Sequence, residues 1–173
     1  FLKENSTLVV DTALFDASFT ARLIESIDGL SESLDGVLIH SDNFQAINSY
    51  AQTLDGSVGC IYIDPPYNSK TSEILYKNTY KHSSWASLIR DRIKASKNLL
   101  ASASSLVVAI DENEQEQLGF ILADVFPDYK RHCVAVIHNK KGIQGDHFSY
   151  CHEYAYFCIP PGRKKTNEKE IPE

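Results

Sequence analysis

The 173 residues suit one α/β domain, because a chain of this length can bury a core without cross-links. No apolar run approaches membrane-spanning length and the N-terminus has none of the parts of a secretory signal, so we expect a cytoplasmic protein without a membrane partner. The net charge of −6 taken as a whole argues against a nucleic-acid partner, and four cysteines without a C-x-x-C pair predict reduced thiols and no metal site.

The N-terminal part of the chain predicts two helices and two strands. Residues 16–29 form an amphipathic pattern that an aspartate can cap and a glycine can end. Residues 37–40 are a short apolar run, which predicts a strand. Residues 44–54 carry apolar side chains at helical spacing. Residues 60–63 are apolar throughout, as expected of a strand that is covered on both faces.

The middle of the chain continues the alternation. A helix is predicted from Ser83 or Ser84, either of which can cap it, to about residue 101. A buried strand is predicted at 106–110. Residues 111–114 resemble a capping box, which predicts that Asp111 caps the helix that follows.

The end of the chain predicts an antiparallel pair of strands at 132–138 and 153–159. Strands that alternate with helices and end in such a hairpin indicate an α/β fold with a mostly parallel sheet and a C-terminal antiparallel hairpin. We divide the chain into a helical segment (1–36), a catalytic part (37–160) and a charged linker (161–173).

The most specific signal is a tetrad that directly follows the strand at 60–63. Its residues are Asp64, Pro65, Pro66 and Tyr67. Two consecutive prolines also make a rigid turn, so a purely structural role is the alternative. Because α/β proteins place ligand sites at the ends of their strands, we favour a functional role.

The tetrad has the residue types that activation of an amino group requires. The exocyclic amine of adenine is a poor nucleophile, since its lone pair is delocalised into the ring. The Asp64 carboxylate can accept one amino hydrogen and the Pro65 carbonyl can accept the other, which frees the lone pair to attack a sulfonium methyl group. Pro66 helps to fix the backbone. Tyr67 offers a flat face on which a flipped base can stack.

The charges of the chain are unevenly distributed around the tetrad. Residues 1–64 contain ten acids and two bases, whereas residues 68–97 contain seven bases and two acids. A solvated helix face with a charged loop would have the same composition. Because the basic stretch directly follows the tetrad, we predict that it lies along the DNA backbone next to the base pocket, with these DNA-binding residues: Lys70, Lys77, Lys81 and His82.

The tetrad resembles the catalytic motif of the amino-methylating DNA methyltransferases. Its setting resembles the Mod subunits of type III restriction–modification systems, and the similarity extends from about residue 8 to residue 160. The segments that carry it, in family order, are 38–46, 82–85, 110–114 and 152–154.

This resemblance implies a partial S-adenosylmethionine-dependent methyltransferase (Rossmann-like) sheet. It implies an enzyme that transfers a methyl group from S-adenosyl-L-methionine to the N6 amino group of adenine in duplex DNA. A second modification subunit and a restriction subunit are further partners that it suggests. The alternatives are a cytosine-N4 or RNA amino-methyltransferase, or a non-catalytic DNA-binding module that retains the motif.

The resemblance also assigns roles to residues outside the tetrad. It places Asp42 near the adenine ring of the cofactor, and Asp42 can cap a helix at the same time. His82 could contact DNA, whereas Trp85 is expected in the core. Tyr154 and Tyr156 can line the base pocket, although alternating aromatic residues in a strand more often serve packing.

One family feature is absent from the sequence. Members of the family hold the methionine end of the cofactor on a Phe-x-Gly-x-Gly turn, and no Gly-x-Gly occurs here. In the permuted order that begins with the tetrad, this turn follows a target-recognition region. We therefore expect the chain to be a fragment that is inactive alone, with its linker leading toward that region.

Overall fold

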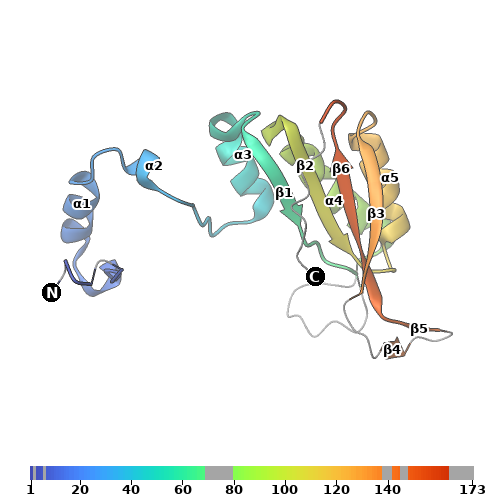
Figure 1. The fold of residues 1–173 in the computed structure, drawn as a ribbon, viewed down its shortest axis with the longest axis horizontal. Coiled ribbons are helices and arrows are strands. Elements are labelled where there is room, and N and C mark those ends of the chain that lie inside the picture. The colour runs from blue at the N-terminus through green and yellow to red at the C-terminus, as the bar shows by residue number, and fades with distance from the viewer. Residues whose placement is uncertain (2, 6, 69–79, 138–141, 145–147, 164–173) are drawn as a thin grey trace, which may run out of the picture. The chain divides into compact units, whose positions relative to one another are not determined.

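The computed structural model describes residues 1–173 except 2, 6, 69–79, 138–141, 145–147 and 164–173. It divides into two compact units, Phe1–His40 and Ser41–Glu173 (Figure 1). Because residues 164–173 are not described, most of the linker expected at 161–173 lies outside the described residues. No helix in the described part of the chain is long and apolar enough to cross a membrane.

The first unit contains short helices: η1 (Thr12–Leu14), α1 (Ala17–Glu25) and α2 (Leu30–Ser33). The Asp16 carboxylate caps α1 as predicted, because its Oδ1 accepts a hydrogen bond from the Phe19 amide at 2.7 Å. The Ser18 hydroxyl also donates to Asp16 Oδ1 at 2.7 Å, and the hydrogen bonds from Ser18 and then Phe19 lower the pKa of Asp16. The helix ends at Glu25, earlier than the predicted residue 29.

The strand predicted at 37–40 is wrong. These four residues lie outside any strand, and Leu38 is 98% exposed. A strand exists only where a neighbour completes its hydrogen bonds, and no described strand pairs with this segment. Apolar composition alone could not reveal that.

The second unit is built on a four-stranded sheet in the order β1-β2-β6-β3 (Figure 1). Its strands are β1 (Val58–Ile63), β2 (Leu100–Ile110), β3 (Lys130–Ile137) and β6 (His152–Ile159). The strands β1 and β2 are parallel, and β6 runs antiparallel to both β2 and β3. Only β6 is therefore reversed in this sheet, which confirms the mostly parallel sheet and the antiparallel pair. Two short strands, β4 (Ile143–Gln144) and β5 (Ser149–Tyr150), pair separately.

The helices of this unit are α3 (Asn43–Leu54), α4 (His82–Ser96) with the turn η2 (Lys97–Leu99), and α5 (Gln115–Val125). Figure 1 shows α4 and α5 together behind the sheet. The core lies between these two helices and the strands β2 and β6, with Trp85, Leu106, Ile110 and Leu122 fully buried. Trp85 is thus the core residue that the sequence predicted.

Three local predictions need correction. The strand β1 is covered on one face only, since Tyr62 is 66% exposed. Neither Ser83 nor Ser84 caps α4, because the helix already begins at His82 after Lys81. Asp111 does not cap α5: its Oδ1 accepts from the Asn113 amide at 2.9 Å in a turn before the helix.

Candidate active site

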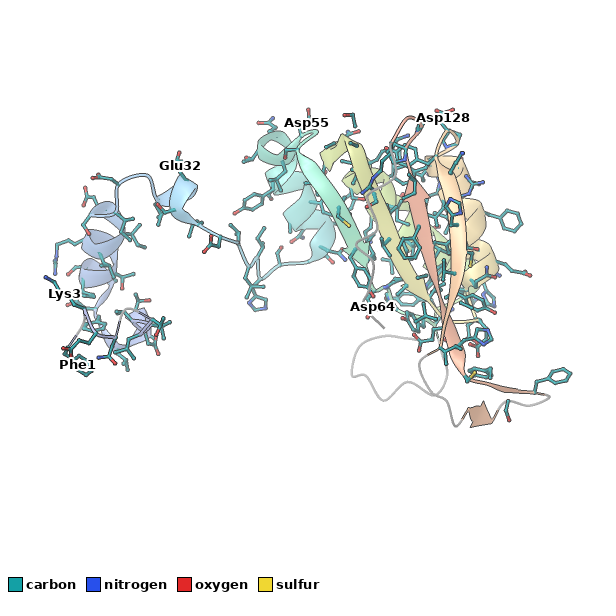
Figure 2. The ribbon with its side chains drawn as sticks, in the orientation of Figure 1. Phe1, Lys3, Glu32, Asp55, Asp64 and Asp128 are labelled. Atoms are coloured by element: carbon teal, nitrogen blue, oxygen red, sulfur yellow. The ribbon has the colours of Figure 1, made fainter. Side chains whose placement is uncertain are left out.

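The tetrad occupies the loop that leaves the carboxyl end of β1 (Figure 2). The parallel strand β2 ends beside it, with Ile63 opposite Val108. Asp64 is exposed, Pro65 is buried and Tyr67 is half-buried. The carboxylate thus faces solvent while the loop behind it is packed into the protein, which is the arrangement a strand-end ligand site requires.

The two proline carbonyls differ in their hydrogen bonding. The indole Nε1 of the buried Trp85 donates to the Pro66 carbonyl oxygen at 2.6 Å. No described residue donates to the carbonyl oxygen of Pro65. Pro65 therefore keeps a backbone acceptor next to the Asp64 carboxylate, whereas the acceptor of Pro66 is already used.

The Tyr67 hydroxyl lies between acidic groups. It donates to Oε2 of Glu153, on β6, at 3.4 Å. Burial, then a hydrogen bond and charge interaction with Asp64, and then the charge of Glu153 raise the pKa of Tyr67 far above its usual value. The hydroxyl consequently stays protonated and serves as a donor to carboxylates.

Behind the tetrad, a buried carboxylate joins two segments. Glu114 is fully buried, and its Oε1 accepts from Asn68 Nδ2 at 2.6 Å and contacts His82 Nδ1 at 2.8 Å. Asn68 itself bonds to both backbone groups of Tyr80: its Oδ1 accepts from the amide at 2.6 Å and its Nδ2 donates to the carbonyl at 3.0 Å. These contacts tie the end of the tetrad to the start of α4 and to the turn before α5.

Asp42 lies on the same cleft as the tetrad. The cleft, of about 700 Å³, opens between the end of β1, the first turn of α3 and the facing side of α4. The Asp42 carboxylate caps α3 through the Phe44 amide at 3.0 Å and pairs with Arg92 at 3.3 Å, yet its side chain stays 50% exposed. The capping alternative is confirmed, and the remaining exposure leaves the carboxylate able to bind a ligand.

The basic stretch divides into paired and exposed residues. Lys70 and Lys77 lie outside the described residues. Lys81 is exposed directly before α4. Arg90 pairs with Asp124 at 2.8 Å, and Arg92 and Lys97 also bond to protein groups. Part of this stretch therefore stabilises the fold, in line with the alternative of a solvated helix face.

His82 and the two tyrosines of β6 have protein partners. His82 contacts the buried Glu114, as described above, although its own side chain is 69% exposed. The Tyr154 hydroxyl lies 3.1 Å from Nε2 of His152. The Tyr156 hydroxyl bonds to Gln115 on α5, and its burial raises the pKa of Tyr156 to about 12. Tyr156 thus packs against α5 as part of the core, which agrees with the alternative that the aromatic residues of this strand serve packing.

Three residues that the structure brings to the site were not found by sequence reasoning. Asn68 directly follows the tetrad and Glu153 lies within the segment 152–154, but nothing local indicates that Asn68 contacts Glu114 or that Glu153 contacts Tyr67. Glu114 was assigned to a capping box, and its side chain caps no helix. Its sequence neighbours are polar and acidic, so no local pattern distinguishes it from an exposed glutamate.

The family of the chain is shown by comparison with known families. Residues 58–173 match the family model N6_N4_Mtase, described as DNA methylase. The chain therefore belongs to this DNA methylase family, as its tetrad indicated.

Within that family, the chain resembles Mod subunits. It is 32% identical over 136 residues to the "Probable type III restriction-modification enzyme HindVI Mod subunit" of Haemophilus influenzae, a match that covers 70% of this chain and 18% of that protein. It is 26% identical over 160 residues to the type III restriction-modification enzyme EcoPI Mod subunit of Escherichia phage P1, covering 73% of this chain and 24% of that protein. The chain thus spans about a fifth of these relatives.

Solved structures share the fold. The M1.HpyAVI–SAM complex superimposes with a TM-score of 0.52 at 14% identity, covering 76% of this chain and 58% of that one. TTHA0409 of Thermus thermophilus, complexed with S-adenosyl-L-methionine, gives 0.51 at 14% identity, with the same coverage of 76% and 58%. These neighbours confirm the predicted methyltransferase-like α/β sheet.

Proposed function

We propose that the protein containing this chain transfers a methyl group from S-adenosyl-L-methionine to the N6 amino group of adenine in duplex DNA, as the modification subunit of a restriction–modification system. The observation that carries the proposal is the pair of acceptors at the end of β1: the exposed Asp64 carboxylate and the Pro65 carbonyl, to which no described residue donates. Family membership and the Mod relatives support the same reaction.

The two acceptors act on the target amine. Asp64 accepts one amino hydrogen and the Pro65 carbonyl accepts the other, so that the nitrogen lone pair is released from the ring toward the incoming methyl group. Because Trp85 holds the Pro66 carbonyl, the loop does not have to reorganise when the base arrives. The Tyr67 ring supplies a stacking face for a base that has left the duplex.

The residues of the cleft fit the proposed cofactor. The cleft of about 700 Å³ is large enough for a nucleoside-sized ligand, and the half-exposed Asp42 carboxylate at its edge can accept hydrogen bonds from such a ligand. When bound, S-adenosyl-L-methionine supplies an electrophilic methyl group. We assign to Asp42 the role of orienting it.

The basic residues next to the tetrad are proposed to contact duplex DNA. Lys81 is exposed before α4, and Lys70 and Lys77 precede it in the sequence. Phosphate contacts of this kind position the duplex without reading its sequence. For His82 the contact with Glu114 favours a structural role over the predicted DNA contact.

A cytoplasmic location and the partnership with a second modification subunit and a restriction subunit belong to the same proposal.

A methyl-transfer assay on the full-length protein tests the proposal. Unmethylated duplex DNA is incubated with methyl-labelled S-adenosyl-L-methionine, and the digested nucleosides are separated. We expect label in N6-methyladenine, at least roughly a hundredfold less with Asp64→Ala, and unchanged binding of the cofactor by that variant.

Asp128→Ala is the matched control. Asp128 is an exposed aspartate at the opposite end of the sheet (Figure 2), so its loss should leave the rate unchanged. Label in N4-methylcytosine would move the proposal to the other amino-methylating reaction. Near-normal turnover by Asp64→Ala would mean that the tetrad is only a structural turn.

A further inference from the structure

A buried carboxylate behind the tetrad has no part in the proposed methyl transfer itself. Glu114 stands at the start of α5, where side chains usually cap the helix, but it caps nothing. Its Oε1 instead meets Asn68 and His82, and its Oε2 has no partner among the described residues. A buried charged group is costly unless its partners compensate for the lost water, so this arrangement needs a reason.

We propose that Glu114 is a positioning residue that holds the tetrad in its reactive geometry through Asn68 and His82. The proposal rests on the proposed function. It assigns to Glu114 no contact with the base or with the cofactor.

The first connection runs through Asn68. This residue follows Tyr67 directly and has a left-handed backbone with φ 62°, a conformation that needs support from its surroundings. Its side-chain amide is held by Glu114 and in turn holds both backbone groups of Tyr80. Glu114 thus fixes Asn68, the residue directly after the tetrad, and through Asn68 it fixes Tyr80.

The second connection runs through α4. His82 contacts Glu114, and Trp85, one helical turn later, donates to the Pro66 carbonyl. Displacement of the first turn of α4 would therefore move the donor that holds Pro66. Trp85 therefore holds the tetrad at Pro66, and Asn68 holds it directly after Tyr67. Glu114 supports both contacts, the first through His82 on α4 and the second through Asn68 itself.

The physical expectation is a loss of turnover without a loss of ligand binding. Misplacement of reacting groups by about 1 Å can lower the rate by on the order of a hundredfold. Since Glu114 is fully buried, it cannot reach DNA or cofactor directly. A variant that frees Asn68 should lower kcat while KM for both substrates changes little.

The experiment compares four variants of the full-length protein. Glu114→Ala removes both contacts, and Glu114→Gln keeps an oxygen that can accept them. Asn68→Gly removes the amide but tolerates the positive φ. Glu116→Ala, which removes an exposed carboxylate from the first turn of the same helix, is the matched control.

Two quantities are measured. The first is kcat and KM in the methyl-transfer assay, with unfolding temperatures measured in parallel. The second is hydrogen–deuterium exchange of the Tyr80 amide, which Asn68 protects and which does not depend on activity. We expect Glu114→Ala and Asn68→Gly each to lower kcat by about thirtyfold or more, with KM within about threefold, and to speed exchange at Tyr80. A fifth variant, which combines Glu114→Ala with Asn68→Gly, should be no worse than the poorer of these two single variants, because both substitutions act on one network.

Glu114→Gln should stay within about fivefold of the wild-type kcat, because it keeps the acceptor, and Glu116→Ala should match the wild type. Unchanged exchange at Tyr80 in Glu114→Ala, or a kcat decrease that only follows the decrease in folded protein, would overturn the inference. If Glu114→Ala does not fold, Asn68→Gly tests the inference in its place: a lower kcat with faster exchange at Tyr80 supports it, and unchanged kcat and exchange overturn it. Glu114→Gln then remains the variant that should stay close to the wild type. If the wild type methylates no DNA, the proposed function fails, and the Tyr80 exchange still tests whether Glu114 positions the loop.

Discussion

The indole Nε1 of Trp85 donates to the carbonyl oxygen of Pro66 over 2.6 Å, so a core residue of α4 fixes the backbone of the tetrad. Trp85 is fully buried, and it is the one tryptophan of the chain. The same side chain therefore packs in the core and holds the backbone of the candidate site.

Trp85→Phe should separate these two roles. The phenyl ring keeps most of the apolar contacts but leaves the Pro66 carbonyl without its donor, which should lower the free energy of unfolding by about 1–3 kcal/mol. The loosened tetrad should lower kcat as well, by about tenfold or more. Chemical unfolding and the methyl-transfer assay measure the two effects. Ile121→Val, a core change on α5 at a residue that does not line the cleft, should cost about 0.5–1.5 kcal/mol and leave kcat unchanged.

Tyr67→Phe should lower kcat by about tenfold. The ring remains available for stacking, but the hydroxyl that lies between Asp64 and Glu153 is removed. A hydrogen bond to a charged group is worth about 1.5–3 kcal/mol. Tyr67→Ala should in addition weaken capture of the base by about 1–3 kcal/mol, seen as a higher KM for DNA. Tyr50→Phe, on the exposed side of α3, is the control, and equal activities of Tyr67→Phe and wild type would assign the hydroxyl no role.

Asp42→Asn should weaken cofactor binding without destabilising α3. Asparagine caps a helix about as well as aspartate, so the hydrogen bond from the Phe44 amide can persist. The negative charge at the cleft is removed, and we expect the Kd for S-adenosyl-L-methionine to rise by about tenfold in calorimetry. Asp16→Asn, the same change at the cap of α1, should leave the Kd unaltered. A Kd that is insensitive to both changes would leave Asp42 as a cap only.

Replacing Lys70, Lys77 and Lys81 with alanine should make DNA binding less sensitive to salt. For every phosphate that the protein no longer neutralises, the slope of log K against log salt becomes shallower by about 0.9. Arg90→Ala is the matched control, because Arg90 is engaged with Asp124 on the protein surface. An equal slope for the triple variant and the wild type would show that this stretch is only a solvated surface.

Sequence reasoning succeeded for those parts of the molecule that depend on local pattern. The tetrad at the end of β1, the helix α3 and the antiparallel pair β3–β6 follow from periodicity, turn residues and one specific motif. The strand at 37–40 failed because a strand depends on a partner that its own residues do not encode.

The supporting network of the site was beyond local reasoning for a similar reason. Asn68 and Glu114 are 46 residues apart, and His82 and Glu114 are 32 residues apart. A glutamate at the start of a helix is typical of a cap, and only the fold shows that this one is turned toward the tetrad.

Asp111 makes the stability of the fold depend on pH in a direction that is unusual for a carboxylate. Burial, opposed by hydrogen bonds from Asn113 and assisted by the charges of Glu112 and Glu153, raises the pKa of Asp111 from 3.8 to about 6. Between these two values the folded protein holds more protons at this site than the unfolded chain does. The contribution of Asp111 to stability is therefore fully present below pH 3.8 and is lost as the pH rises through about 6.

The stability of Asp111→Asn relative to wild type should consequently be higher at about pH 7.5 than at about pH 4.5. Asparagine keeps the acceptor for the Asn113 backbone amide and removes the charge that burial disfavours, while the loss of the acceptor for Asn113 Nδ2 costs the same at every pH. A gain of about 1 kcal/mol corresponds to about 2–4 °C in Tm for a protein of this size. Thermal unfolding of the two proteins across this pH range measures the difference. Asp128→Asn, at an exposed aspartate, should give a difference that does not change with pH. A pH-independent difference for Asp111→Asn would mean that its carboxylate is charged in the folded protein throughout the range, and that burial at the end of β2 does not hold it protonated.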